Sequence, residues 1–368
     1  AAAAAAAAVT GVLTATAAIS GPAARPGGPA GPPAALSHVP PYYVVLADLV
    51  ESREAVVRAS ATGQVLATVR PPRPYGIFTF VTGAADDRTF VLAAQRWWPI
   101  ARGNRGMAAE QRDNATPMVF FRLRIDPAAH TARLTRLRLP VVPAAPDLAG
   151  IGLSPDAGRL ALALHQGSGP GTARGPAIEV VTLATGARRT WTWPGGGWIG
   201  NFKPLGQPLS WTADGRFLAF QQWGGRLDST ASVRILDTAA PGTSLRASKL
   251  VVSFYNRDSA PGVGDGNTLI TPDGSSVIAS TTTTAGSGQH YRTTLEIDRY
   301  SAATGHLTGW RARWHIAGWQ DVLWTSRSGS TLIIIDARGK AGAGVTGVLD
   351  PAGFTPLPGA PAAIQIAW

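Results

Sequence analysis

The 368-residue sequence lacks cysteine, which excludes disulfide bonds, thiolate metal sites and cysteine nucleophiles. It also lacks a Gly-x-Ser-x-Gly nucleophile elbow and a Gly-x-x-x-x-Gly-Lys-Ser/Thr phosphate-binding loop. None of its six histidines forms a His-x-x-x-His or His-Glu-x-x-His pair. We therefore name no catalytic residue, no metal ligand and no cofactor.

Lysine is scarce, so arginine supplies nearly all of the formal net charge of +11. No run of five or more basic residues occurs, and the densest group, Arg133, Arg136 and Arg138, is interleaved with leucines. This alternation predicts a β-strand with one solvated face and does not favour a nucleic-acid patch. We expect no nucleic-acid partner.

After residue 40 no long segment shows clean helical periodicity. The 43 glycines and 29 prolines are too many for a helical protein, and they suit short strands joined by turns. Because 45% of the residues are apolar, the chain can build a large core from such strands. The composition thus predicts an all-β protein.

One phrase repeats along the chain: an apolar strand, a turn containing Asp and Gly, and a second apolar strand. It occurs at residues 153–162, 210–220 and 270–279, with a weaker copy at 324–334. A period of this length indicates radial β-repeats. The inner strands of propeller blades are buried on both faces, which explains the second, strongly apolar strand.

The aspartates of the phrase, Asp156, Asp214 and Asp273, are spaced 58 and 59 residues apart. An Asp that recurs in most repeats is more simply a turn former than a catalytic group. In these turns we expect the Asp side chain to fold back on its own backbone and Gly to take a positive φ angle. We interpret the three aspartates as structural turns.

A second motif, Ala-Thr-Gly, follows alternating strands at residues 61–63, 184–186 and 303–305, and predicts an outer hairpin. Pairing the two motifs gives six units, at residues 42–70, 76–140, 148–195, 206–254, 266–315 and 320–358. The first unit lacks its innermost strand, and the apolar segment 363–368 is expected to complete it and close the ring. We predict a six-bladed β-propeller of four-stranded antiparallel blades over residues 41–368, with seven blades as the alternative.

These turns resemble those of TolB-like and WD-repeat-like propellers, whose inner hairpins carry a Ser/Thr-Pro-Asp-Gly-Arg/Lys turn. The pattern looks closest to membrane-tethered or exported propellers of high-GC actinobacteria. The resemblance covers most of residues 41–368 and implies a fold and a location, without an activity. The Trp-Asp dipeptide of true WD repeats is absent.

The uncharged residues 1–20 are long enough to span a bilayer as a helix, and residues 21–40 form a Pro/Gly/Ala-rich spacer. We expect a single-pass membrane anchor; a cleaved secretory signal and a soluble low-complexity tail are the alternatives. Since the first residue is not Met, residues before Ala1 are expected. The propeller would then lie outside the cytoplasm, at the cell membrane or secreted.

Function is sought in the parts that do not repeat. The long loop at residues 96–117 and the loop at 254–266 are candidate binding loops, and tryptophan clusters are either packing or an aromatic platform. The candidate binding residues are Trp97, Trp98, Arg102, Arg105, Trp198, Tyr255 and Arg257.

The favoured hypothesis is a monomeric, non-catalytic binding or sensing propeller of the bacterial cell envelope, with a protein or an envelope polymer as partner. One alternative is a glycan hydrolase or lyase on the same fold, which requires a carboxylate pair, or His165 with acids, at the channel mouth. The other is an intracellular WD-repeat-like scaffold, which requires that residues 1–20 form no membrane segment.

Overall fold

The structure, a computed structural model, describes about three fifths of the chain. The described residues are 39–46, 53–96, 117–139, 142–144, 148–164, 175–193, 198–199, 209–223, 230–255, 268–285, 292–317, 322–325, 332–336, 345–350, 353–358 and 365–367. The expected membrane segment at 1–20, and the spacer up to residue 38, lie outside them. Within these ranges no helix is long and apolar enough to cross a membrane.

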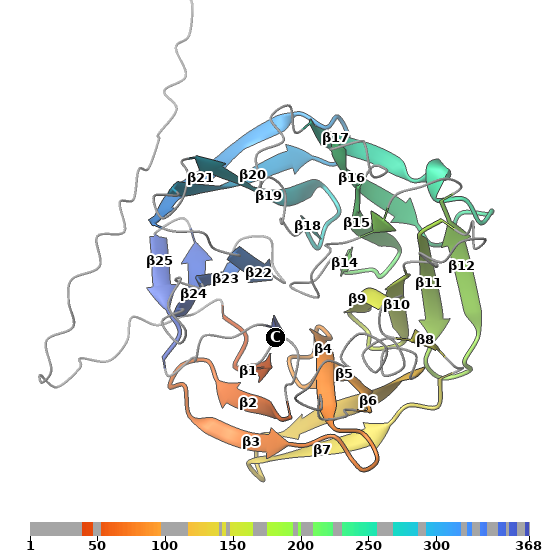
Figure 1. The fold of residues 1–368 in the computed structure, drawn as a ribbon, viewed down its shortest axis with the longest axis vertical. Coiled ribbons are helices and arrows are strands. Elements are labelled where there is room, and N and C mark those ends of the chain that lie inside the picture. The colour runs from red at the N-terminus through yellow and green to blue at the C-terminus, as the bar shows by residue number, and fades with distance from the viewer. Residues whose placement is uncertain are drawn as a thin grey trace, which may run out of the picture.

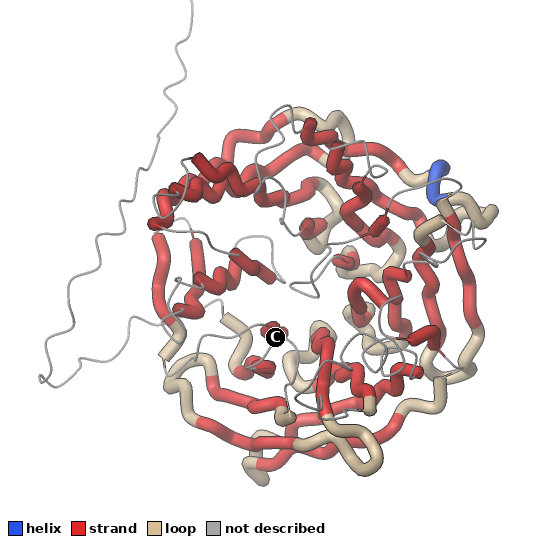
Figure 2. The backbone as a smooth tube through the Cα atoms, viewed as in Figure 1, coloured by secondary structure: helices blue, strands red, loops and turns tan. Residues whose placement is uncertain are grey.

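The described strands group into six antiparallel sheets, which stand around a central axis in the view of Figure 1. Four strands form the main path of each sheet, and their order runs from the axis to the rim. Figure 2 shows that strands dominate the described backbone; its one described helix is the short 3-10 helix η2 (Leu245–Ala247). The all-β prediction with four-stranded antiparallel sheets is confirmed.

Sheets 1 to 3 contain the first half of the described chain. Sheet 1 has β26 (Gln365–Ala367), β1 (Tyr42–Leu46), β2 (Ala55–Ala59) and β3 (Val65–Val69). Sheet 2 has β4 (Ile77–Gly83), β5 (Thr89–Gln95), β6 (Pro117–Asp126) and β7 (Thr131–Arg136), with β8 (Val142–Ala144) paired to β6. Sheet 3 has β9 (Leu148–Leu153), β10 (Arg159–Leu164), β11 (Ala177–Thr182) and β12 (Arg188–Thr192).

Sheets 4 to 6 continue around the axis. Sheet 4 has β13 (Trp198–Ile199) and β14 (Leu209–Trp211), both paired to β15 (Phe217–Trp223), followed by β16 (Thr230–Asp237) and β17 (Lys249–Tyr255). Sheet 5 has β18 (Thr268–Ile270), β19 (Ser276–Ala285), β20 (Arg292–Ser301) and β21 (Leu307–Ala317). Sheet 6 has β22 (Val322–Thr325), β23 (Leu332–Asp336), β24 (Val345–Asp350) and β25 (Gly353–Pro356). The short strands β8 and β13 fall outside the six predicted units.

The C-terminal strand completes the sheet that contains the first strand, as the sequence predicts. β26 pairs antiparallel with β1, joining Val44 to Ala367 and Leu46 to Gln365. Its Gln365 side chain also accepts a hydrogen bond from the backbone N–H of Val81 on sheet 2, at 3.2 Å. The same strand therefore closes sheet 1 and fastens it to the next sheet.

The core lies between neighbouring sheets, because inner strands such as β5 and β10 are apolar and buried on both faces. Separate buried clusters fill the space between sheets 1 and 2, 2 and 3, 3 and 4, and 4 and 5. In β10 every residue after Arg159 is buried. In the outer strand β7 exposed and partly buried residues alternate from Thr131 to Thr135, but Arg136 is exposed on the opposite face from Arg133. The prediction that these arginines share one solvated face is therefore wrong.

Polar side chains on the innermost strands join one sheet to the next. Thr82 on β4 accepts a hydrogen bond from the N–H of Leu153 at 3.1 Å, and Ser210 on β14 accepts one from Ile270 at 3.2 Å. Gly152 holds the equivalent place on β9, where a Cβ would stand 2.9 Å from that of Leu209. There the Trp211 indole N–H donates to the Gly152 carbonyl instead, at 3.0 Å.

Candidate binding site

The repeated phrase forms a set of turns between the first and second strands of a sheet. In each turn the hydroxyl of a Ser or Thr donates a hydrogen bond to the carboxylate of the Asp two residues later. The same hydroxyl oxygen accepts a hydrogen bond from the backbone N–H five residues after it. The Asp carboxylate also accepts a hydrogen bond from a backbone N–H of the turn. The pairs are Ser154 with Asp156, Thr212 with Asp214, and Thr271 with Asp273. The three predicted turn aspartates thus lie in turns, with their carboxylates engaged locally.

Sheet 2 makes the same turn with different residues. Ala84 stands where the other turns have a hydroxyl, and the hydroxyl comes from Thr89, which donates to Asp86 at 2.6 Å. Asp86 then accepts the N–H of Thr89 directly, at 2.7 Å. The turn therefore depends on one Asp and one hydroxyl group, and the residue that carries the hydroxyl can come before or after the Asp.

Neighbouring turns contact each other around the ring. The N–H of Ala85 donates to the carbonyl of Pro155, and that of Ala213 donates to Pro272, at 2.9 and 2.8 Å. Between these two contacts, the Arg159 guanidinium lies over the Trp211 ring and donates to the carbonyl of Gly215 at 2.7 Å. These contacts fix the positions of the turns relative to one another.

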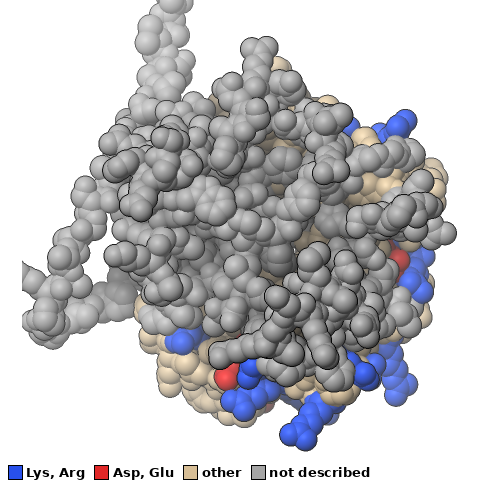
Figure 3. All heavy atoms as spheres, viewed as in Figure 1, with Lys and Arg blue, Asp and Glu red and all other residues tan. Residues whose placement is uncertain are grey.

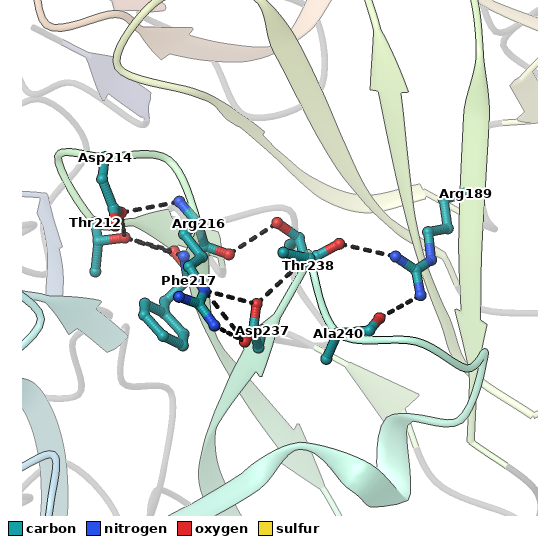
Figure 4. Close-up of polar contacts among 9 residues, drawn as sticks. Arg189, Thr212, Asp214, Arg216, Phe217, Asp237, Thr238 and Ala240 are labelled. Atoms are coloured by element: carbon teal, nitrogen blue, oxygen red, sulfur yellow. Dashed lines mark hydrogen bonds and ion pairs between the residues drawn. The ribbon is translucent and has the colours of Figure 1, made fainter.

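Two arginines reinforce sheet 4, one from its own turn before β15 and one from sheet 3, as Figure 4 shows. Arg216 forms a two-pronged ion pair with Asp237, with a shortest distance of 2.7 Å. Arg189, from β12, donates to the carbonyls of Thr238 and Ala240, and its guanidinium stacks 4.6 Å from the centre of the Trp191 ring. Both guanidiniums are thus occupied by structural contacts.

A groove of about 750 Å³ opens between the turns of sheets 4 and 5; we call it the interblade groove. Its apolar lining includes Phe217, Ile235 and Ile270. Its polar lining includes Lys249, Ser275 and the turn carboxylates of Asp214 and Asp273. Lys249 is exposed, and its ammonium donates to the carbonyl of Ala303 at 2.7 Å, which leaves further N–H groups that can reach a ligand. A mostly apolar groove with a few fixed polar groups is suited to binding, and its volume is that of a small-molecule or peptide-side-chain site.

No protein-family model and no curated protein matches the sequence. TolB from Acinetobacter baumannii matches in structure with a TM-score of 0.50 at 13% identity, over 89% of this chain and 66% of TolB. The chain folds as a TolB-like β-propeller. At this identity the likeness extends to the fold alone.

Two further solved structures match this propeller at lower TM-scores. A protein of unknown function from Bacteroides caccae gives 0.47 at 9% identity, over 89% of this chain and 98% of that one. The β-propeller domain of the Trilobed protease from Pyrococcus furiosus gives 0.40 at 10% identity, over 76% and 69%.

The binding residues predicted from the propeller's loops are not placed together by the described residues. Trp97, Trp98, Arg102, Arg105 and Arg257 lie outside the described residues. Trp198 and Tyr255 are described as backbone only, in β13 and β17, where they pair with Trp223 and Thr230. The interblade groove was not among the predicted sites, because it arises from turns that the sequence indicates only as structure.

The tryptophans of the propeller that the structure describes with their side chains serve packing. Trp191 and Trp211 are buried in the cluster between sheets 3 and 4. Trp193 packs against the same cluster, with Arg234 4.8 Å and Arg246 5.8 Å from its ring centre. At these three positions the tryptophan rings pack between sheets and do not form an aromatic platform for a ligand.

One turn of the propeller places a positive φ angle on alanine. Ala157 has φ +55°, while the equivalent positions in sheets 4 and 5 are Gly215 and Gly274, at +66° and +71°. The expectation that glycine takes this angle is wrong for sheet 3, where Gly158 is the next residue. A left-handed conformation costs a non-glycine residue roughly 1–2 kcal/mol.

Replacing Ala157 by glycine should therefore stabilise the propeller by about 0.5–1 kcal/mol, since the strain relieved exceeds the entropy lost. Urea denaturation of A157G against wild type measures this. Ala184→Gly, at an exposed turn position outside the positive-φ residues described, is the matched control and should instead destabilise. A lower stability for A157G would show that the alanine is not strained.

The turn carboxylates should make the propeller sensitive to acid. The hydrogen bond from Thr271, followed by those from Ser275, lowers the pKa of Asp273 from 3.8 to about 2, and similar bonds from Ser154 and Thr212 lower the pKa of Asp156 and Asp214. Because the pKa is lower in the folded state, the stabilisation is complete above pH 3.8 and is lost as the pH falls toward 2.

We expect the free energy of unfolding of wild type to fall over this pH range, and that of Asp273→Asn to fall less steeply, because Asn does not titrate. Thr271→Val, which removes the first cause of the low pKa, should flatten the profile in the same way. Identical slopes for wild type and both variants between pH 4 and 2 would contradict this prediction.

Proposed function

We propose that this protein is a non-catalytic binding or sensing propeller of the bacterial cell envelope, whose six sheets close into a six-bladed ring. The observation that carries the binding role is the interblade groove, which combines an apolar lining with one lysine and the carboxylates of Asp214 and Asp273. The partner we favour is a protein that inserts an apolar side chain there, with a backbone carbonyl or a carboxylate placed toward Lys249. An apolar anchor in a pocket with a polar rim is the usual arrangement of an interface hot spot.

The state of the turn carboxylates supports a role without catalysis. Acid–base chemistry on a glycan requires two carboxyl groups that face the substrate and are free to exchange protons. Asp214 and Asp273 line the groove, but they, like Asp156, accept hydrogen bonds within their own turns, and the pKa of each is lowered. These carboxyl groups are therefore deprotonated at neutral pH and cannot act as proton donors.

The location at the envelope rests on the N-terminal sequence. Residues 1–20 carry no charge, and the Pro/Gly-rich residues 21–40 would hold the propeller away from a membrane. Cell fractionation tests this part: we expect the chain in the membrane fraction, and we expect externally added protease to digest the propeller in cells whose outer layers are permeabilised. A soluble cytosolic pool would overturn the location.

Site-specific cross-linking tests the groove. A photoreactive phenylalanine analogue at Ser275, on the groove lining, should give a discrete adduct in cells, while the analogue at the exposed Val65 on β3 should not. Lys249→Glu, at an exposed position of the lining, should abolish the Ser275 adduct by reversing a charge at the groove, without changing the amount of folded protein. An adduct that survives Lys249→Glu, or that also forms from position 65, would exclude the groove as the binding site.

A further inference from the structure

The outer strands of sheets 2 and 3 bring four arginines to the two facing sides of one interblade wedge. Arg122 and Arg124 lie on β6, Arg133 lies on β7 and Arg188 lies on β12. The acidic residues on these strand faces are Glu179 of β11 and Asp126 at the end of β6, whose carboxylate accepts the backbone N–H groups of Ala128 and Ala129 in its own turn. We call this group the arginine wedge.

Strand register decides that the side chains of sheet 2 point into the wedge. Arg122 pairs with Val91, a member of the core cluster between sheets 2 and 3, and cross-strand partners share a face. Arg124, two residues along, lies on the same face and is directly opposite Arg133. By contrast, Arg136 points to the other face, where its guanidinium lies 5.8 Å from the Tyr75 ring centre.

Cross-strand pairing also decides on which face of sheet 3 Glu179 and Arg188 lie. Glu179 pairs with Leu162, and Arg188 pairs with Val181; both partners belong to the cluster between sheets 2 and 3. Glu179 is 8% exposed and its carboxylate lies 3.4 Å from the guanidinium of Arg188. The Glu179 carboxylate is thus already engaged by Arg188, the arginine that sheet 3 contributes to the wedge.

The three arginines of sheet 2 outnumber the one carboxylate on their face, that of Asp126, which accepts hydrogen bonds within its own turn. Arg124 and Arg133 are both exposed and directly opposite, an arrangement of like charges that destabilises a sheet. Nε of Arg122 is buried and has no hydrogen-bond partner. Figure 3 shows the lysines and arginines of this side of the ring at the rim, where a solute can reach them.

We propose that the arginine wedge binds a phosphate-bearing ligand. A phosphate group carries close to two negative charges at neutral pH and has several strong acceptor oxygens, so it can accept from two or three guanidiniums at once. A carboxylate neutralises only one, as Glu179 does with Arg188. The phosphate is either a single group or one member of a phosphate chain, and this site is separate from the interblade groove.

Calorimetric titration of the purified full chain with inorganic phosphate and with tripolyphosphate tests the proposal. Binding of both probes with similar affinity would identify a single phosphate as the ligand, and much tighter binding of tripolyphosphate would identify a phosphate chain. Arg124→Gln and Arg133→Gln should each weaken binding about tenfold, the loss expected for one charge-assisted hydrogen bond. The matched controls Arg136→Gln and Arg138→Gln, which remove the same charge nearby, should change the affinity less than twofold.

Thermal unfolding separates binding from a structural role. In phosphate-free buffer, Arg124→Gln should melt at the same temperature as wild type or higher, because a like-charge pair is removed. With tripolyphosphate, wild type should gain stability and the variant should not. No binding of either probe, equal losses in the control variants, or a lower melting temperature of Arg124→Gln in phosphate-free buffer would each overturn the proposal.

Discussion

Trp211→Ala is expected to lower the free energy of unfolding by about 3–5 kcal/mol, the range for removing a buried aromatic side chain. The ring is 8% exposed and belongs to the cluster between sheets 3 and 4. It also donates the hydrogen bond to Gly152 and lies under the Arg159 guanidinium, 5.2 Å from its ring centre. One substitution therefore removes packing, a hydrogen bond and a cation–π contact from a single interface between sheets.

Trp211→Phe divides this loss into its parts. Phenylalanine keeps an aromatic ring under Arg159 but cannot donate to Gly152, whose carbonyl would then be left without that partner. We expect a loss of about 1–3 kcal/mol, clearly smaller than that of the alanine variant, in equilibrium urea denaturation followed by tryptophan fluorescence and circular dichroism. Equal losses for the two variants would show that the indole N–H, and not the packing of the ring, dominates.

Gly305→Ala is expected to cost about 2–5 kcal/mol, from a left-handed backbone angle and from overpacking. Gly305 has φ +74°, and a Cβ at this position would collide with the carbonyl oxygen of Val251 on β17. That oxygen belongs to a strand of the neighbouring sheet and cannot turn aside as a flexible side chain can. The substitution should therefore push sheet 5 away from sheet 4.

Gly242→Ala separates the two causes. Gly242 also has a positive φ, +97°, but no atom lies within 4 Å of a Cβ placed there. Denaturation should show only the conformational cost for G242A, about 1–2 kcal/mol, and a larger loss for G305A. If the two variants lost the same amount, the close approach between sheets 4 and 5 would have no energetic weight.

The sequence repeats predicted the sheets well, because each turn with the same backbone conformation uses the same types of residue. The spacing of Asp156, Asp214 and Asp273 placed three turns, and the apolar C-terminal segment indicated the pairing of β26 with β1. Ala157 and Ala84 departed from the pattern, since the surrounding turn can hold an alanine in strain or take its hydroxyl from another position. These departures follow from local geometry that one sequence does not encode on its own.

The contacts between sheets could not be predicted, because they depend on how strands far apart in sequence stand beside each other. Nothing around Ser210 indicates that it accepts a hydrogen bond from Ile270. Arg133 and Arg136 are three residues apart, so a strand places them on opposite faces, but only the structure shows which neighbouring sheet each face meets. The interblade groove likewise exists only where two turns meet. The binding role of the residues chosen from the loops at 96–117 and 254–266 remains a prediction.

The pairing of β26 with β1 has a consequence for how the chain is made. β1 leaves the ribosome among the first strands of the propeller, while its inner neighbour is synthesised more than three hundred residues later. Until then the edge of β1, with buried Val44 and Val45, is open to any passing strand, and open apolar edges are where nascent chains associate wrongly. A folding helper that covers this edge during synthesis would protect the chain until its own last strand arrives.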